Sequence, residues 1–274
     1  MLPKLPAIAV ALWGLDGASI GIGAPPGGGR VREVIDWLAG HVVAGVRGVR
    51  LDATMAGTRP RELDRSGRRD LASLLRRNEL SFGGVDVFVP PEHLVRADLV
   101  DRAMSSVLGA IDLAADVGAL ASGAVVARAT TASGGGVSVG LILHDTTPPD
   151  VVRTIADHAE ERGVRVANHA WPIAESGDAD SAIGVGLDPA VALAAAGDPV
   201  ALAVRLGRRL ACARIGDVGA GGERVTPGRG RLDVASYLVT LATTGYTGPA
   251  VLDLRALKQP AEVIRAVAAA AGAI

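Results

Sequence analysis

The sequence contains few lysine and cysteine residues, and each shortage excludes a class of chemistry. Only Lys4 and Lys258 among its 28 basic residues are lysines. Schiff-base catalysis, which needs an amine nucleophile, is therefore nearly excluded, because an arginine guanidinium stays protonated. The single cysteine, Cys212, cannot form an internal disulfide and has no cysteine partners for a zinc cluster. A reduced, cytoplasmic location is expected.

The chain also lacks a strong net charge and a long uncharged apolar run. It has 28 basic and 29 acidic residues, so it has no large excess of positive charge of the kind that nucleic-acid binding relies on. No apolar run reaches the roughly 18 residues of a membrane span. The apolar run at 7–12 resembles a short signal peptide, but the polar break at 13–16 favours a first strand instead. We expect a small-molecule ligand, and neither a nucleic acid nor a membrane as partner.

Short apolar runs alternate with amphipathic stretches along the 274 residues, which is typical of a parallel sheet wrapped by helices. This pattern predicts an α/β protein with one domain over 1–274, a single (β/α)8 barrel. Strands are predicted near 7–13, 46–52, 80–89, 137–143, 164–169, 183–187, 210–215 and 250–254. Helices are predicted at 30–44, 66–78, 97–117, 148–162, 189–206, 233–243 and 260–272.

Two segments fit this alternation less well. Residues 118–136 form an excursion before the fourth strand, unless Ala124–Ala129 is itself that strand. Residues 170–182 are rich in turn formers and are too short for a full helix with its loops.

Polar residues stand where most of the predicted strands end. In a parallel barrel, the carboxyl ends of the strands and the loops after them form the functional site. A single such residue is more often a turn or cap former, but their recurrence at one end of the barrel favours a site. These residues are Asp52, Asp86, His144, Asp145, Asn168, His169, Asp188, Arg214, Asp217, Asp253 and Arg255.

Seven segments together resemble one known family in their order and spacing. They are 45–53, 82–93, 156–169, 186–189 (Gly-Leu-Asp-Pro), 214–217 (Arg-Ile-Gly-Asp), 226–233 and 245–253. On these segments, most of the chain resembles the sugar phosphate isomerase/epimerase group of xylose-isomerase-like barrels. That group includes the ketose 3-epimerases and is related to endonuclease IV. The resemblance implies a carbohydrate-type ligand, and it makes a homodimer plausible.

The resemblance also implies a divalent metal such as Mn, Mg or Zn, but this chain departs from the usual ligands. Family members hold the metal with Glu, Asp, His and Glu on strands five to eight. Here the first glutamate falls on Ala167, the histidine on Arg214, and the last glutamate becomes the shorter Asp253. Strand six keeps Asp188, although the histidine usual three residues later is Val191. Only Asp188 and Asp253 remain as ligands if a metal is present, so we expect no metal cofactor.

An arginine at a ligand position suggests what could replace the metal. A guanidinium can bridge two carboxylates through charge-assisted hydrogen bonds. Side-chain alternation along the second strand also turns Arg50 to the same side as Asp52. We therefore predict a network that joins Arg214 to Asp188 and Asp253, with Arg50 as a further member.

Three functional interpretations follow. In the first, the barrel remains an isomerase or epimerase, with His144 or His169 as the base, Asp253 as its partner or an alternative base, and Arg214 as the electrophile. In the second, it is a non-catalytic binding or regulatory protein of the same fold, and in the third it catalyses an unrelated metal-free reaction.

Further candidates would contact a substrate at the same end of the barrel. The loop at 226–231 could offer backbone amides and Arg229 or Arg231 to an anionic substrate, or it could be a simple turn. The candidate substrate-binding residues are Asp52, Asp86, Asn168, Asp188, Arg229 and Arg255.

Overall fold

The computed structural model describes residues 4–15, 30–43, 45–122, 137–175 and 177–272. Eight parallel strands close into a barrel, with each strand paired to the next and the last paired to the first. The barrel strands are β1 (Ile8–Ala11), β2 (Val46–Asp52), β3 (Ser81–Asp86), β4 (Ser138–Leu141), β5 (Arg165–Asn168), β6 (Ile183–Leu187), β7 (Leu210–Ile215) and β10 (Ala250–Leu252). The predicted (β/α)8 barrel is confirmed.

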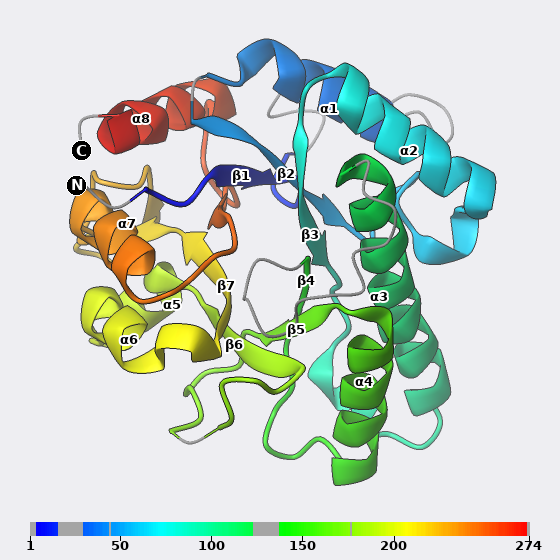
Figure 1. Cartoon of the computed structure of the whole chain (residues 1–274). Helices are drawn as coiled ribbons and strands as arrows, with labels where there is room; N and C mark the ends of the chain where they lie inside the picture. Colours follow the sequence, from blue (N-terminus) through cyan, green and yellow to red (C-terminus); the bar gives the residue numbers. More distant parts are fainter. Residues whose placement is uncertain (1–3, 16–29, 44, 123–136, 176, 273–274) are drawn as a thin grey trace.

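Helices form a ring around the barrel, as Figure 1 shows. They are α1 (Arg30–His41), α2 (Arg65–Arg77), α3 (Val100–Ser122), α4 (Pro149–Arg162), α5 (Pro189–Ala194), α6 (Pro199–Leu206), α7 (Val234–Thr243) and α8 (Pro260–Gly272). Short 3-10 turns η1 (Pro60–Glu62), η2 (Pro91–Leu94) and η4 (Gly207–Arg209) join them. The apolar faces of these helices and the outward side chains of the strands form the main core.

Each barrel strand lies within a predicted strand, including the least regular one. The fourth strand is 138–141, and the alternative at Ala124–Ala129 lies outside the described residues. One helix prediction was wrong, because 189–206 contains two helices, α5 and α6. Asp198 accepts hydrogen bonds from the amides of Val200 and Ala201 and so begins a new helix, with Pro199 in its first turn.

Helix α3 extends to Ser122, five residues beyond its predicted end. By length and composition alone it could cross a membrane. In the barrel, however, its apolar face packs inward against the core. Its Asp112 and Asp116 form ion pairs with Arg162 of α4 at 3.0 and 2.7 Å. These contacts are those of an outer helix of the barrel.

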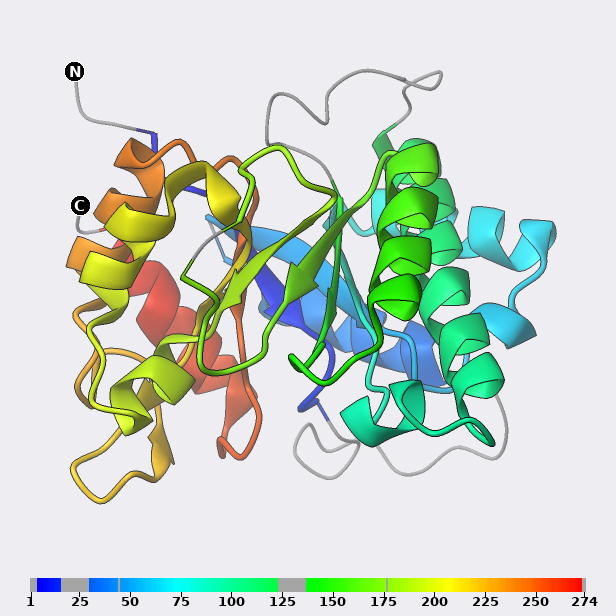
Figure 2. The same ribbon diagram turned by 90° about the horizontal axis from the view of Figure 1, so that it is seen from below.

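A small hairpin follows β7 and was not predicted. Its strands, β8 (Asp217–Val218) and β9 (Arg224–Val225), pair antiparallel. In the side view of Figure 2 the hairpin lies on the lower side, at the same end of the barrel as the η2 turn. It therefore belongs to the end at which the strands finish, and it brings Arg224 there.

A buried arginine and aspartate network at the barrel mouth

The inward faces of four strands place charged side chains in the interior of the barrel. Arg50 of β2, Asp86 of β3, Arg214 of β7 and Asp253, directly after β10, are between 0% and 4% exposed. A small core cluster on the neighbouring strand positions consists of Ala11, Ala167, Ala211, Cys212 and Val251. Ala11 is the register partner of Arg50, and Val251 is that of Arg214. The small size of most of these side chains leaves room for the long arginines.

Asp86 is the centre of the first half of this network. Its Oδ1 accepts from Arg50 Nε at 2.8 Å and lies 2.9 Å from Arg214 Nη2. Arg50 is held further by the carbonyls of Gly83 and Val85 and by the Ser138 hydroxyl, each at 3.0 Å. Two guanidiniums thus share one buried carboxylate.

The second half of the network lies nearer the solvent. Arg255 Nε donates to both oxygens of Asp253, at 2.9 and 2.8 Å, and Arg224 Nη1 lies 3.0 Å from Asp253 Oδ2. Asp188 Oδ2 accepts from Arg224 at 3.1 Å and from Arg255 at 3.3 Å. Its Oδ1 accepts from the amide of Ala190 at 3.0 Å and so caps α5. Arg214 Nη1, 3.8 Å from Asp253 Oδ2, connects the two halves.

The carboxylates of Asp86 and Asp253 stay ionised at neutral pH. Burial alone would raise the pKa of Asp86, but the charges of Arg214 and Arg50 hold that pKa well below its usual range. Burial would also raise the pKa of Asp253, yet the hydrogen bond from Arg255 and the nearby guanidiniums lower it. Four arginines (50, 214, 224 and 255) face three aspartates (86, 188 and 253), which leaves one excess positive charge.

His169, which follows β5, lies beside the first half of the network. Burial, and then the charge of Arg214, lower the pKa of His169 well below 6.5, so its imidazole is neutral. Its ring packs against Gly186 of β6, where a Cβ atom would overlap the ring. A Cβ atom on Gly140 of β4 would overlap Asp86 Oδ1 and come within 3.2 Å of His169 Nε2. Glycine at these positions therefore permits the side chains to approach each other.

Several buried polar atoms of this centre have no hydrogen-bond partner. They are Asp86 Oδ2, Arg214 Nη1, and both ring nitrogens of His169. Leaving a buried donor or acceptor unsatisfied costs about 1–3 kcal/mol, so such atoms call for an explanation. Together they offer acceptors on Asp86 and His169 and a donor on Arg214, which suits a bound molecule with hydroxyl and carbonyl oxygens.

The residues present do not fit a divalent metal. Among the described residues, no group of three or more His, Cys, Asp or Glu side chains is placed to hold one. The carboxylates of Asp86, Asp188 and Asp253 are already bound by guanidiniums, which would repel a cation. Ala167 is buried among small side chains, and Val191 is 38% exposed.

The predicted network therefore exists with different partners. Arg214 pairs with Asp86 and approaches Asp253, whereas the predicted pairing of Arg214 with Asp188 was wrong. Asp188 is instead bound by Arg224 and Arg255. Arg224 was missed because it lies on the short hairpin, and its only signal was an arginine in the loop after β7.

Other predicted site residues lie outside the network. His144 and Arg229 are exposed, and neither side chain makes a hydrogen bond or ion pair within the described part of the chain. Asp52 caps its own turn by accepting from the amide and hydroxyl of Thr54, at 2.8 and 2.6 Å. Asn168 exchanges hydrogen bonds with the backbone of Leu143, both at 2.9 Å, and so ties the ends of β4 and β5 together.

The backbone amides of the 226–231 loop are already bound by a carboxylate of this chain. Asp217, 1% exposed, accepts from the amides of Gly228, Gly230 and Arg231, at 3.0, 2.9 and 2.9 Å. It also accepts from the amides of Val218 and Leu232. Of the two alternatives for this loop, the contacts of Asp217 favour the turn over a set of amides free for an anionic substrate.

Aromatic side chains lie beside the network at the end of the barrel. Arg255 stacks on the Trp13 ring with 4.4 Å between the guanidinium carbon and the ring centroid. Trp13 in turn lies 5.5 Å from Phe88, centroid to centroid. Phe88 and Trp171 are 52% and 38% exposed. Apolar faces beside a few polar groups are typical of small-molecule sites.

Comparisons with known proteins agree with this architecture. A xylose isomerase domain protein from Planctomyces limnophilus is similar over 99% of this chain and 98% of that one, with 16% identity and a TM-score of 0.63. An E. coli 3-keto-D-glucoside 4-epimerase in its apo form is similar over 99% and 100%, with 15% identity and a TM-score of 0.64. The IOLI protein, whose structure contains a zinc atom, is similar over 97% and 98%, with 13% identity and a TM-score of 0.63.

No curated protein matches the sequence. The model of the xylose isomerase-like TIM barrel family, however, matches residues 42–271, which is most of the chain. At such low identity the solved structures support the fold alone. With the family match and the closed barrel together, the chain belongs to the xylose isomerase-like TIM barrel family.

Proposed function

We propose that this barrel binds a small carbohydrate-type molecule at the carboxyl ends of its strands and acts on it as an isomerase or epimerase, without a divalent metal. The observation that carries the proposal is the group of unsatisfied buried atoms on Asp86, His169 and Arg214. A sugar supplies hydroxyl and carbonyl oxygens that match these donors and acceptors. The nearby aromatic faces of Trp13 and Phe88 suit the apolar side of such a ligand.

The chemistry would be proton transfer at a carbon next to a carbonyl. His169 is neutral and can take the proton, while the electron pair moves to the carbonyl oxygen and forms an enediolate. Arg214 Nη1 has a free donor for that oxygen, and the excess positive charge of the network stabilises the negative charge that develops. In an isomerisation, His169 returns the proton to the former carbonyl carbon, and the proton of the neighbouring hydroxyl moves to the former carbonyl oxygen. In an epimerisation, water protonates the opposite face of the same carbon, and His169 releases its proton to the resulting hydroxide. Asp86 Oδ2 would orient the substrate by accepting from a hydroxyl.

In this proposal the guanidiniums supply the positive charge that a divalent metal supplies in metal-dependent enzymes. The IOLI structure contains a zinc atom, and the E. coli relative is named as a sugar epimerase. In this chain Arg214 lies among the inner carboxylates, and it bridges Asp86 and Asp253. A fixed guanidinium cannot polarise a carbonyl as strongly as a metal, but it needs no metal supply.

A second candidate function is ligand binding without catalysis. The low basicity of the two inner carboxylates favours this function, because arginines lower the pKa values of both Asp86 and Asp253. A lowered pKa makes each carboxylate a weaker base, so proton abstraction by Asp86 or Asp253 is disfavoured. If His169 also does not move a proton, the network has only a binding role.

Deuterium exchange separates the two candidates. The purified protein, treated with a chelator, is incubated in D2O with a panel of aldoses, ketoses and their oxidised derivatives, while binding is followed by calorimetry. The enzyme proposal predicts incorporation of deuterium at the carbon next to the carbonyl, lost in His169→Gln and kept in His144→Gln. Binding without exchange would establish the non-catalytic function, and the reverse response of the two variants would move the base to His144.

The absence of any sugar binding by the wild-type protein would contradict both candidates. Exchange that appears only after a divalent metal is added back would contradict the role given to Arg214.

A further inference from the structure

A second cleft lies beside the network, at the ends of β2 and β3. It has a volume of about 390 Å³ and lies between the loops after these strands, the η1 turn and the start of α3. Its lining residues are Ala53, Thr54, Arg59, Pro60, Arg61, Val87, Phe88, Arg102, Ser105 and Ser106. None of these residues belongs to the arginine and aspartate network.

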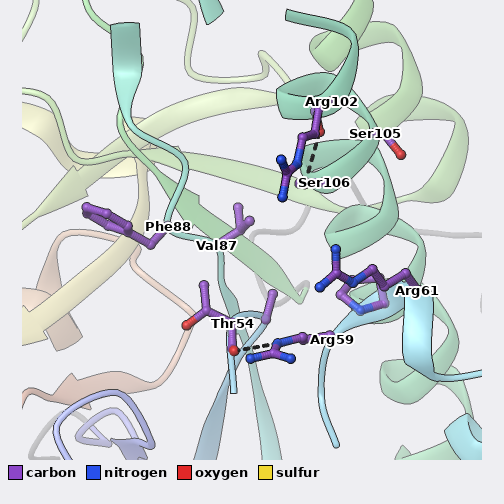
Figure 3. A pocket seen from close by; sticks show the side chains of 10 residues that line it. Thr54, Arg59, Arg61, Val87, Phe88, Arg102, Ser105 and Ser106 are labelled. Atoms are coloured by element: carbon purple, nitrogen blue, oxygen red, sulfur yellow. Dashed lines mark hydrogen bonds between the residues drawn. The ribbon is translucent and has the colours of Figure 1, made fainter. Parts of the chain in front are cut away.

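Three guanidiniums border this cleft, and only that of Arg59 is held by a short ion pair. Arg59 donates to the carbonyl of Thr54 and to Glu62, both at 2.9 Å. Within the described residues, the side chains of Arg61 and Arg102 make no hydrogen bond or ion pair. Figure 3 shows both side chains extending toward the same space, Arg61 from the η1 turn and Arg102 from α3. The cleft therefore offers two guanidiniums with free hydrogen-bond donors, and the charge of Glu62 acts on Arg61 without forming a short ion pair with it.

The other walls divide the cleft into a polar and an apolar part. Ser105, on the first turns of α3, has a hydroxyl with no partner among the described residues. Val87, Phe88 and Pro60 are apolar residues of the lining. In Figure 3, Val87 lies between the arginines and Phe88, whose ring lies on the far side of Val87. The hydroxyl of Ser106 already donates to the carbonyl of Arg102 at 3.0 Å.

We propose that this cleft binds a small phosphorylated molecule, with its phosphate on Arg61 and Arg102 and its organic part on Phe88 and Val87. A phosphate monoester carries a charge of about −1.5 to −2 near pH 7 and several acceptor oxygens. That charge matches the two free guanidiniums, and arginine forks suit phosphate oxygens. The cleft volume lies in the range typical of small-molecule sites. This inference does not depend on the reaction at the network.

Binding of ribose 5-phosphate, inorganic phosphate, ribose and malonate, measured by calorimetry, tests the proposal. We expect both phosphates to bind wild-type protein, with an affinity that falls as NaCl is raised. The double variant Arg61→Gln/Arg102→Gln should weaken this affinity at least about tenfold, because two charge-assisted contacts are lost. Arg69→Gln/Arg77→Gln is the matched control, since both arginines are exposed and lie outside the cleft.

Equal affinity of the two double variants for phosphate would overturn the proposal, and so would the absence of phosphate binding by wild-type protein. Malonate, a dianion without phosphorus, should bind more weakly than inorganic phosphate, and equal binding would overturn the assignment to phosphate. In the wild-type protein, ribose 5-phosphate should also protect Arg61 and Arg102, but not Arg69 and Arg77, from an arginine-selective dicarbonyl reagent. Protection of all four or of none would contradict the site.

Discussion

Asp86 neutralises two buried guanidiniums, so its charge should matter more than that of any exposed aspartate. The substitution Asp86→Asn keeps nearly the same shape and one oxygen acceptor but removes the negative charge. Arg50 would still reach the carbonyls of Gly83 and Val85 and the Ser138 hydroxyl. Arg214 would contact a neutral amide oxygen in place of the carboxylate, and its remaining charged partner would be Asp253, at 3.8 Å.

The expected loss of stability follows from the removal of the Asp86 charge. Removing one member of a buried ion pair costs about 3–5 kcal/mol, because the remaining charge is left uncompensated. Arg50 and Arg214 are 1% and 4% exposed, so water cannot replace Asp86. We therefore expect the free energy of unfolding to fall by about 3–5 kcal/mol, a large part of the roughly 5–15 kcal/mol of a typical domain.

Equilibrium unfolding in urea at several pH values measures this effect. The lowered pKa of Asp86 means that its contribution is complete above the ordinary aspartate value of 3.8 and is lost as the pH falls below it. The difference between wild-type protein and Asp86→Asn should therefore be constant from pH 5 to 8 and shrink at lower pH. Asp145→Asn, at an exposed position, should change stability by less than about 0.5 kcal/mol. A loss below about 1 kcal/mol in Asp86→Asn would mean that the Asp86 charge does not compensate the two buried guanidiniums.

Three further predictions follow from the same contacts. Gly186→Ala places a Cβ atom on the His169 ring, so calorimetry should show that sugar binding is lost. The free energy of unfolding should fall by about 1–3 kcal/mol. Unchanged sugar binding would contradict the position of the ring. In Asp217→Asn, the amide oxygen cannot accept all five backbone hydrogen bonds of the carboxylate. Urea unfolding should therefore show that the free energy of unfolding falls by about 2–4 kcal/mol. An unchanged free energy would mean that the loop does not depend on this carboxylate. Because the pKa of His169 is lowered, the rate of deuterium exchange should stay constant from pH 8 to below 6.5 and fall only at more acidic pH. A fall in this rate centred near pH 6.5 would exclude His169 as the base.

The barrel could be predicted because each strand is a short apolar run between turn residues, and this pattern is local in the sequence. The break between α5 and α6 was missed, although Asp198 and Pro199 are ordinary signals of a helix start. The apolar spacing continues across this break and hid it. Residues 123–136, with the alternative fourth strand, lie outside the described residues.

The candidate site was predictable in position but not in its pairings. Strand alternation turned Arg50 to the same side as Asp52, the family resemblance placed Arg214 at a metal-ligand position, and both side chains are buried inside the barrel. Which carboxylate each arginine binds depends on side-chain reach across the barrel, which the sequence does not specify. The second half of the network also depends on the β8–β9 hairpin, whose two-residue strands are too short to give a periodic pattern.

We propose that guanidiniums take the place of a metal at the inner carboxylates. Elemental analysis of protein purified from medium supplemented with Mn, Zn, Co and Mg tests this replacement. We predict far less than one equivalent of any of these metals per chain, and no gain when they are added back to chelator-treated protein. One equivalent of bound metal that is lost in Asp188→Asn or Asp253→Asn would mean that these carboxylates hold a metal and that the guanidiniums do not replace it.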